Sequence, residues 1–215
     1  MRIIAGTKRG MKLFSPKGKD SRPVTDRVKE SVFSVLDKYD LPAGKLVADL
    51  FCGVGSLGVE ALSRGAEFVT FVENDPKVIA VLQKNIEKAG FVGRTKVIRA
   101  DAFKFGTEDK DFRFSIFDFR FTSIERQSAI GDRQLAYDLI FVDPPYAATK
   151  DVGADSPLGG LLILLAEQLA PEAIVVVRTR KQTELLARYG WLGIIERRRL
   201  GTMAVTILRH GQDGK

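Results

Sequence analysis

Residues 46–58 read Leu-Val-Ala-Asp-Leu-Phe-Cys-Gly-Val-Gly-Ser-Leu-Gly. The part from Leu46 to Phe51 is almost wholly apolar, which is typical of a strand buried on both faces. Gly53, Gly55 and Gly58 follow, and a helix is predicted from Ser56, with Ser56 as its N-cap. The first two glycines allow the backbone to approach a ligand closely, and the third allows helix and strand to pack closely. Taken alone, the stretch fits a nucleotide-like cofactor and a tight strand-to-helix turn equally well.

A carboxylate at the end of the next strand favours the cofactor. The apolar run 68–72 predicts this strand, and Glu73 follows it, about 20 residues beyond the first glycine. A carboxylate at that place can accept hydrogen bonds from both hydroxyls of a ribose. The alternative, an exposed acid at a strand end, does not explain the spacing.

The rest of the chain alternates strands and helices. Strands are predicted at 96–100, 137–142 and 173–177, and helices at about 26–38, 76–89, 157–170 and 181–188. Two closing antiparallel strands are predicted at 192–198 and 203–209. This order predicts an α/β fold with a doubly wound, Rossmann-like sheet, mostly parallel and ending in antiparallel C-terminal strands.

Two segments are predicted to lie outside this sheet. Residues 1–40 form a basic extension, with a hairpin that pairs 2–5 with 11–14 and then a helix, ahead of a main domain at 41–215. Residues 106–136 alternate in two phases and are interpreted as an inserted hairpin. Its interleaved arginines and phenylalanines suit single-stranded nucleic acid, but a locally packed flap explains them more simply.

The composition is that of an ordinary globular protein. The 215 residues are 45% hydrophobic and 28% charged, which suits one main domain with a sizeable core. No run approaches the ~18 apolar residues of a membrane span, and the first residues lack the apolar core of a signal peptide. One cysteine and one histidine exclude an internal disulfide and disfavour a zinc site. We therefore expect a cytoplasmic monomer that uses neither a membrane nor a metal.

The positive charge lies at the two ends of the chain. Residues 1–30 carry nine Lys and Arg against three acids, and residues 178–199 carry seven against two. The stretch 31–177 has 16 basic and 21 acidic residues. This asymmetry suits a polyanion such as nucleic acid held by the flanks, while charge alone is explained as well by a solvated surface.

Asp143-Pro144-Pro145-Tyr146 follows a predicted strand and indicates the chemistry. Two prolines remove two N–H donors and leave carbonyls as acceptors beside the Asp143 carboxylate. Acceptors without donors suit a planar –NH2 group, and accepting both of its hydrogens makes the nitrogen lone pair available to attack a methyl sulfonium. Tyr146 can stack on the base that carries the amine. The alternative is a Pro-Pro turn with a buried tyrosine.

Together these motifs resemble the class I methyltransferases that use S-adenosylmethionine. More narrowly, they resemble the RsmD family of bacterial small-subunit rRNA guanine-N2 methyltransferases, over most of the chain. The motifs that carry the resemblance are Arg2-Ile-Ile-Ala-Gly6, Arg22-Pro-Val-Thr-Asp-Arg27, Asp49-Leu-Phe-Cys-Gly-Val-Gly55, Glu60-Ala-Leu-Ser-Arg-Gly-Ala66, Phe71-Val-Glu-Asn-Asp75 and Asp143-Pro-Pro-Tyr146.

The resemblance implies a role for each site residue. Asp49, Gly53 and Gly55 would line the methionine end of S-adenosylmethionine, and Glu73 would hold the ribose. Asp101, with the backbone of Ala102, would contact the adenine. Asp143 and the Pro144 carbonyl would hold the target amine, and Tyr146 would stack on its base. The expected partner is ribosomal RNA or the small ribosomal subunit, facing Arg2, Lys8, Arg9, Lys12, Arg22 and Arg27.

Other functions explain fewer of these features. An adenine-N6 methyltransferase shares Asp-Pro-Pro-Tyr. A nicotinamide-dependent dehydrogenase would explain the glycines and Glu73 but neither Asp143-Pro-Pro-Tyr146 nor the basic ends. A non-catalytic RNA-binding assembly factor would explain the charge alone. A Cys–His nucleophile is not expected, because Cys52 is interpreted as a small core residue and His210 as a surface residue near the end of the chain.

Overall fold

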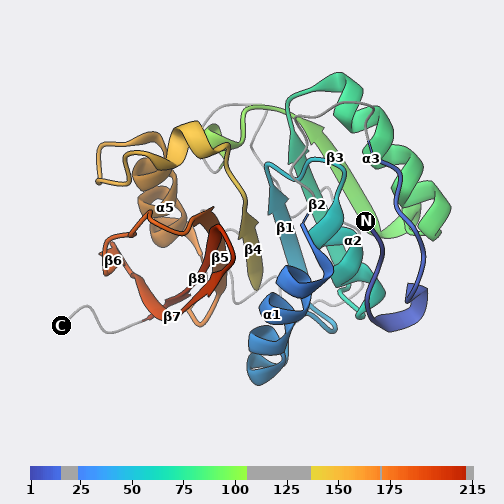
Figure 1. Cartoon of the computed structure of the whole chain (residues 1–215), viewed down its shortest axis with the longest axis horizontal. Helices are drawn as coiled ribbons and strands as arrows, with labels where there is room; N and C mark the ends of the chain where they lie inside the picture. The colour runs from blue at the N-terminus through green and yellow to red at the C-terminus, as the bar shows by residue number, and fades with distance from the viewer. Residues whose placement is uncertain (16–23, 106–136, 170, 212–215) are drawn as a thin grey trace.

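The computed structural model describes residues 1–15, 24–105, 137–169 and 171–211, and these residues form a sheet with helices on both faces (Figure 1). The sheet has eight strands in the order β3-β2-β1-β4-β5-β8-β7-β6. Strands β1 to β5 are parallel, and β6 to β8 are antiparallel. Their bounds are β1 Leu46–Leu50, β2 Phe68–Glu73, β3 Thr95–Arg99, β4 Leu139–Val142, β5 Ile174–Arg180, β6 Arg188–Tyr189, β7 Leu192–Leu200 and β8 Met203–His210. The predicted doubly wound, mostly parallel sheet is confirmed.

Two hydrophobic cores lie on the two faces of the sheet. Helices α1 (Asp26–Leu36), α2 (Ser56–Ser63) and α3 (Pro76–Ala89) contribute to one core, and α5 (Pro157–Gln168) contributes to the other. Neighbouring strand residues alternate between them, as Phe71 and Val72 do. Because the central strands β1 and β4 are buried along their whole length, their sequences are almost continuous apolar runs rather than alternating ones.

The ends of α3 follow directly from the sequence. The Asp75 carboxylate accepts a hydrogen bond from the Lys77 N–H at 2.7 Å, and Pro76 is the first helical residue. Gly90 follows the last turn with a φ of 73°, which glycine adopts at little cost. The predicted helix 76–89 is confirmed in its bounds.

The predicted cap of α2 is wrong. Gly55, with a φ of 81°, is the N-cap residue, and Ser56 is already the first helical residue. The side chain that serves the helix end comes from β1 instead: Asp49 Oδ2 accepts the Gly58 N–H at 2.8 Å. Gly58 itself packs as predicted, because an added Cβ would lie 2.3 Å from the Phe71 ring.

The predicted N-terminal hairpin is present in part: Arg2 and Lys12 form an antiparallel bridge, and backbone hydrogen bonds join Ile3 to Met11 and Gly10 around a short 3-10 turn at Gly6–Lys8. The strand ladder is interrupted because the N–H groups of Ile4 and Ala5 donate to the Glu60 carboxylate of α2. We call residues 1–15 the N-terminal strap. The strap shares the first core with α1 and α2, through the side chains of Ile3 and Leu13.

The predicted helix at 181–188 is wrong. Residues 182–187 contain no helix, and the two-residue strand β6 begins at Arg188. The carbonyls of Lys181 and Thr183, which a helix would use internally, accept hydrogen bonds from Arg197 Nη2. Glu184 also binds Arg197 and Arg199 of β7, so the arginines of β7 hold this segment in a non-helical conformation.

Among the described residues, no helix is both long and apolar enough to cross a membrane. They also hold no cluster of three or more histidine, cysteine or acidic side chains suited to a metal ion. The predicted insertion at 106–136 and Arg22 lie outside the described residues.

Candidate functional site

A cavity of about 400 Å³ opens at the carboxyl ends of the parallel strands. Doubly wound sheets bind ligands at this edge, where the strand order reverses, which is between β1 and β4 here. The cavity is lined mainly by residues at or after the carboxyl ends of β1, β2, β3 and β4, and by Arg178 within β5. Of the site residues predicted from the sequence, it is lined by Gly53, Glu73, Asp101, Ala102, Asp143 and Pro144.

The glycine turn and Glu73 are joined directly. Glu73 Oε2 accepts the Gly53 N–H at 3.0 Å, and Oε1 accepts the N–H groups of Asn74 and Asp75. Gly53 has a φ of 55°, and an added Cβ there would meet no atom within 4 Å. Open space beside the backbone is what close approach of a ligand requires.

Gly55 has a different reason to be glycine. An added Cβ at this position would lie 2.4 Å from a Leu82 methyl group and 3.2 Å from the Phe71 ring. The residue is buried and does not border the cavity. The absence of a side chain at Gly55 lets the loop pack closely against Leu82 of α3.

Asp49 lies beneath the cavity and not on its surface. Its side chain is buried, and desolvation raises its pKa well above 3.8. The hydrogen bond from Gly58 lowers the pKa, and the nearby charge of Asp143 raises it further. Asp49 therefore binds the N-terminus of α2 and lies close enough to Asp143 for their charges to interact.

Asp101 forms the opposite wall, after β3. Its Oδ1 accepts the Phe103 N–H at 3.1 Å and caps a 3-10 turn at Ala102–Lys104. The Phe103 ring meets the Phe51 ring edge-on, with centroids 4.7 Å apart. Asp101 remains exposed, so its carboxylate is accessible to a ligand in the cavity.

Asp143 is paired with Arg178, one of the basic residues of the stretch 178–199. Arg178 Nε donates to Asp143 Oδ1 at 2.6 Å, and its Nη2 lies 2.5 Å from Oδ2. Val142 of β4 is in register with Val177 of β5, so the two side chains follow at equivalent places on adjacent strands. This register would have indicated the pair, but it can be read from the sequence only after the two strands have been aligned.

Tyr146 lies just outside the cavity lining, in a 3-10 turn at Tyr146–Thr149. The Arg180 guanidinium lies 4.9 Å from the centre of its ring. Thr183 Oγ1 donates to the Thr149 carbonyl and ties this turn to the segment after β5. A base that stacks on Tyr146 therefore has Arg180 as a neighbour.

Cys52 and His210 do not form a nucleophilic pair. Cys52 is buried, as predicted, and burial raises the pKa of its thiol. His210 is also buried, at 8% exposure, so its predicted surface position is wrong. As the last residue of β8 it packs against α5, and its Nε2 lies 2.9 Å from the Ala166 carbonyl.

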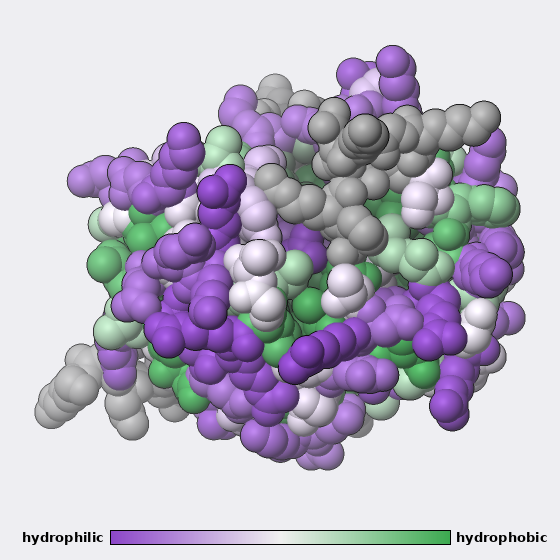
Figure 2. Space-filling view, viewed as in Figure 1, coloured by the Kyte–Doolittle hydropathy of each residue, from purple (hydrophilic) through white to green (hydrophobic). Residues whose placement is uncertain are grey.

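The predicted RNA-facing cations are only partly available. Arg2, Arg9, Lys12 and Arg27 are exposed and Lys8 is half-buried, with Arg2 paired to Asp26 at 2.7 Å. Two residues counted in the basic flanks are buried and paired, Lys29 with Glu60 and Arg178 with Asp143. Hydrophilic side chains still cover the part of the surface over β7, β8 and α1 (Figure 2).

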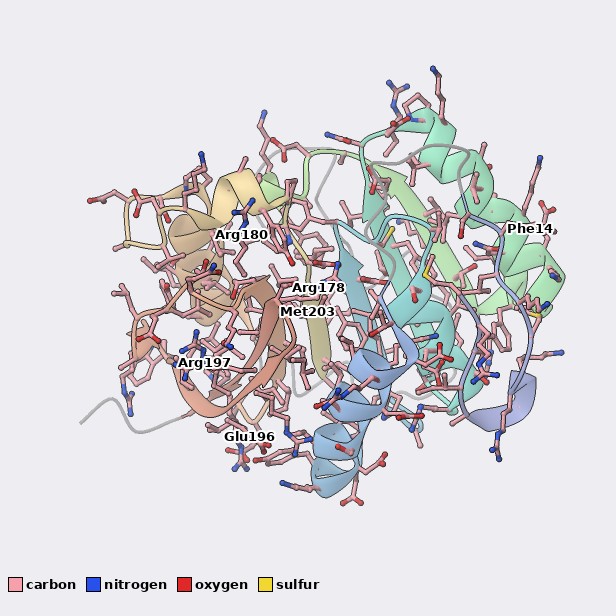
Figure 3. The ribbon with its side chains drawn as sticks, in the orientation of Figure 1. Phe14, Arg178, Arg180, Glu196, Arg197 and Met203 are labelled. Atoms are coloured by element: carbon pink, nitrogen blue, oxygen red, sulfur yellow. The ribbon has the colours of Figure 1, made fainter. Side chains whose placement is uncertain are left out.

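One exposed aromatic residue of the strap was missed. Phe14 is 49% exposed, and the Lys88 ammonium lies 4.5 Å from the centre of its ring. It lies beside α3, across the molecule from Arg180 and Arg197 (Figure 3). An isolated phenylalanine in a polar stretch gives no periodic signal, so only the structure shows its exposure.

Comparison with known proteins identifies the family. A family model described as "Conserved hypothetical protein 95" matches residues 1–121 and 115–209. The chain belongs to this family. The YlbH protein of Bacillus subtilis (strain 168) is 32% identical over 212 residues, covering 97% of this chain and 98% of that protein. Ribosomal RNA small subunit methyltransferase D of Haemophilus influenzae is 33% identical over 194 residues, covering 89% and 84%.

A solved structure gives the same result. The yhhF protein of Escherichia coli superposes with a TM-score of 0.74 at 27% identity and covers 99% of both chains. The resemblance to the RsmD family and to class I methyltransferases is therefore confirmed. The dehydrogenase and assembly-factor alternatives have no support among these relatives.

Proposed function

We propose that this family member transfers the methyl group of S-adenosylmethionine to the exocyclic N2 amine of a guanine in small-subunit ribosomal RNA. The observation that carries the proposal is that Gly53, Glu73, Asp101 and Asp143 all line the same cavity. A cofactor site and an amine-acceptor site thus share one space. The name of the Haemophilus influenzae relative supports ribosomal RNA as the substrate.

The residues of the cavity fit S-adenosylmethionine. When bound, it supplies an electrophilic methyl group on a sulfonium. Glu73 holds the ribose through Oε2, which accepts one backbone N–H and keeps a lone pair, whereas Oε1 already accepts two. Asp101 and the backbone of Ala102 hold the adenine. Ser56 Oγ borders the cavity, is buried, and has no hydrogen-bond partner in the described residues, so a polar ligand group would satisfy it.

Asp49 and Gly55 support the cofactor indirectly. Both lie beneath the lining, where Asp49 holds the start of α2 and Gly55 lets the loop pack on α3. Gly53 alone of the predicted methionine-end residues borders the cavity. The methionine end therefore lies against Gly53, over a support made by the other two.

Asp143 and Pro144 hold the target amine. The Asp143 carboxylate and the Pro144 carbonyl accept the two amine hydrogens, and neither Pro144 nor Pro145 has an N–H that would compete. Holding both hydrogens leaves the nitrogen lone pair directed at the methyl group. Positioning of this kind supplies much of the rate in a direct displacement.

The target base must leave its stack to reach this cavity, so a nucleotide in a loop is favoured over one in a duplex. Tyr146 stacks on the extruded base at the cavity mouth. The exposed cations of the strap and Phe14 bind the flanking RNA through phosphates and stacking. Residues 1–40 are thereby the RNA-facing part and 41–215 the catalytic domain.

Substitution at Asp143 tests the proposal. Asp143→Asn keeps one carbonyl acceptor but places a donor where an acceptor stood, and Asp143→Ala removes the contact. We expect turnover to fall in both, more in Asp143→Ala, while cofactor affinity changes little because the group faces the substrate. Single-turnover methylation of ribosomal RNA and of subunits from a strain that lacks the gene measures the rates, and nucleoside analysis identifies the product.

Two results would count against the proposal. A methyl group on a carbon or on a ribose oxygen would exclude amine transfer, and a wild-type rate in Asp143→Ala would remove Asp143 from the site. A methyl group on adenine N6 would keep the mechanism and change the base. Comparison of free RNA with assembled subunits identifies the substrate form.

A further inference from the structure

The Arg178 guanidinium forms a two-bond contact with Asp143 in the wall of the cavity. Nε and Nη2 each meet one carboxylate oxygen, at 2.6 and 2.5 Å. Paired bonds of this type set the orientation of the carboxylate as well as its charge. A carboxylate has about four lone-pair sites, which is more than the two bonds from Arg178 occupy.

Arg178 and Asp143 lie beside the buried Asp49. The charges of Asp143 and Glu73 raise the pKa of Asp49, and the charge of Arg178 lowers it. Among the described residues that line the cavity, Arg178 is the only one with a basic side chain.

The pair is a poor device for stability. Arg178 is 6% exposed, and its Nη1 is buried without a hydrogen-bond partner in the described residues. A buried ion pair repays little of its desolvation cost, and an unsatisfied donor adds to that cost. Arg178 lies toward the centre of the molecule, where β4 and β5 meet, whereas Arg180 on the same strand lies further out (Figure 3). A role in the site explains an arginine at this position better than folding does.

We propose that Arg178 is the positioning residue for the target amine: its two bonds hold the Asp143 carboxylate in the one orientation in which that carboxylate receives an amine hydrogen. This inference rests on the proposed function. It predicts that Arg178 acts on substrate binding and turnover through Asp143 and does not act on the cofactor.

The test uses an RNA fragment that carries the mapped target guanine and a matched fragment with inosine, which lacks the 2-amino group. Without cofactor, the wild type is expected to bind the guanine fragment about tenfold or more tightly than the inosine fragment, as for a hydrogen bond to a charged group. Arg178→Met is expected to lose most of that ratio and to slow single-turnover methylation by about tenfold or more. Calorimetry is expected to show unchanged affinity for S-adenosylmethionine.

Arg178→Lys separates charge from geometry. Lysine keeps the positive charge but cannot make two parallel bonds, so we expect partial recovery of both readouts relative to Arg178→Met. If Arg178→Met does not fold, the lysine variant carries the test. Arg209→Met is the matched control, because Arg209 pairs with Glu172 at the other end of the β5–β8 ladder.

The outcomes are distinct. A wild type that does not methylate guanine N2 overturns the proposed function, and this inference with it. An active wild type with unchanged discrimination and rate in Arg178→Met overturns the inference alone. A loss of cofactor affinity in either Arg178 variant also overturns it, because Arg178 would then act on the cofactor site.

Discussion

At the scale of single residues, Asp49 makes the unliganded protein sensitive to pH. Desolvation raises the pKa of this carboxyl well above 3.8 in the folded state. The folded state then binds the proton more tightly than the unfolded state. The resulting stability is fully present below the unfolded pKa and is lost as pH rises through the raised value. Without ligand, the free energy of unfolding should therefore contain a term that falls toward neutral pH.

Asp49→Asn should remove that term. The asparagine carbonyl still accepts the Gly58 N–H but carries no charge to desolvate. Denaturant unfolding from acid to neutral pH should show the wild type losing more stability than the variant. Glu67→Gln, at an exposed acid, should behave as the wild type. An equal loss in the wild type and in Asp49→Asn would show that this carboxyl is not the source.

Sequence reasoning identified site residues where motif and strand end coincide. Glu73, Asp101 and Asp143 each follow a strand, and parallel strands bring their carboxyl ends to one edge. It did not find Arg178 or the true reason for Gly55. Both depend on contacts with distant residues, Asp143 in the first case and Leu82 in the second. Composition and spacing carry no information about such partners.

At the scale of elements, the strap is held to α2 by the buried acid Glu60 and by Ser63, whose Oγ accepts the Lys8 N–H and donates to the Ala5 carbonyl. Glu60 accepts the N–H groups of Ile4 and Ala5, and it pairs with Lys29 at 3.2 Å and Arg64 at 3.0 Å. Lys29 Nζ in turn donates to the Arg2 carbonyl. Burial is the main cause that lowers the pKa of Lys29, and the charge of Glu60 opposes it. Removing Glu60 would leave an uncompensated buried cation.

Glu60→Gln should therefore destabilise the protein by about 3–5 kcal/mol, the cost of breaking a buried pair on one side. Glu60→Gln combined with Lys29→Met should cost less than that, since no buried charge remains. Denaturant unfolding measures both values, with Glu87→Gln on the exposed face of α3 as control. Agreement of Glu60→Gln with the wild type within about 1 kcal/mol would contradict the anchoring role.

Whether an element is fixed by its own residues or by distant ones explains which elements were predicted well from the sequence. Helix α3 carries its own caps, Asp75 and Gly90, so its bounds were correct. The extent of the strap hairpin and the absence of a helix at 181–188 depend on distant side chains, Glu60 of α2 and Arg197 of β7. A local preference for helix or strand is overridden where a distant side chain forms hydrogen bonds with the backbone groups that the predicted element would use.

At the scale of the whole molecule, charge counted along the chain overstates the charge available to RNA. The sequence places nine basic residues in 1–30, but Lys29 is buried against Glu60. Lys8, Arg9 and Lys12 form no ion pair within the described residues, whereas Lys38, Lys45 and Arg209 pair with Glu196, Asp138 and Glu172. A cation already matched by a carboxylate attracts phosphate less than an unmatched one. Position relative to acids, which the sequence does not give, decides the electrostatic surface.

Replacing Lys8, Arg9 and Lys12 with glutamine should weaken RNA binding and reduce its salt dependence. If these three cations each meet a phosphate of single-stranded RNA, the slope of log affinity against log salt should fall in magnitude by about 2. The control replaces Lys38, Lys45 and Arg209 with glutamine, which removes the same charge from paired positions and should change the slope much less. Filter binding of small-subunit rRNA across a salt series measures the slopes, and calorimetry should show unchanged affinity for S-adenosylmethionine in both variants. Equal losses in the two triple variants would mean that net charge alone governs binding, and an unchanged slope in the first would place the RNA away from the strap.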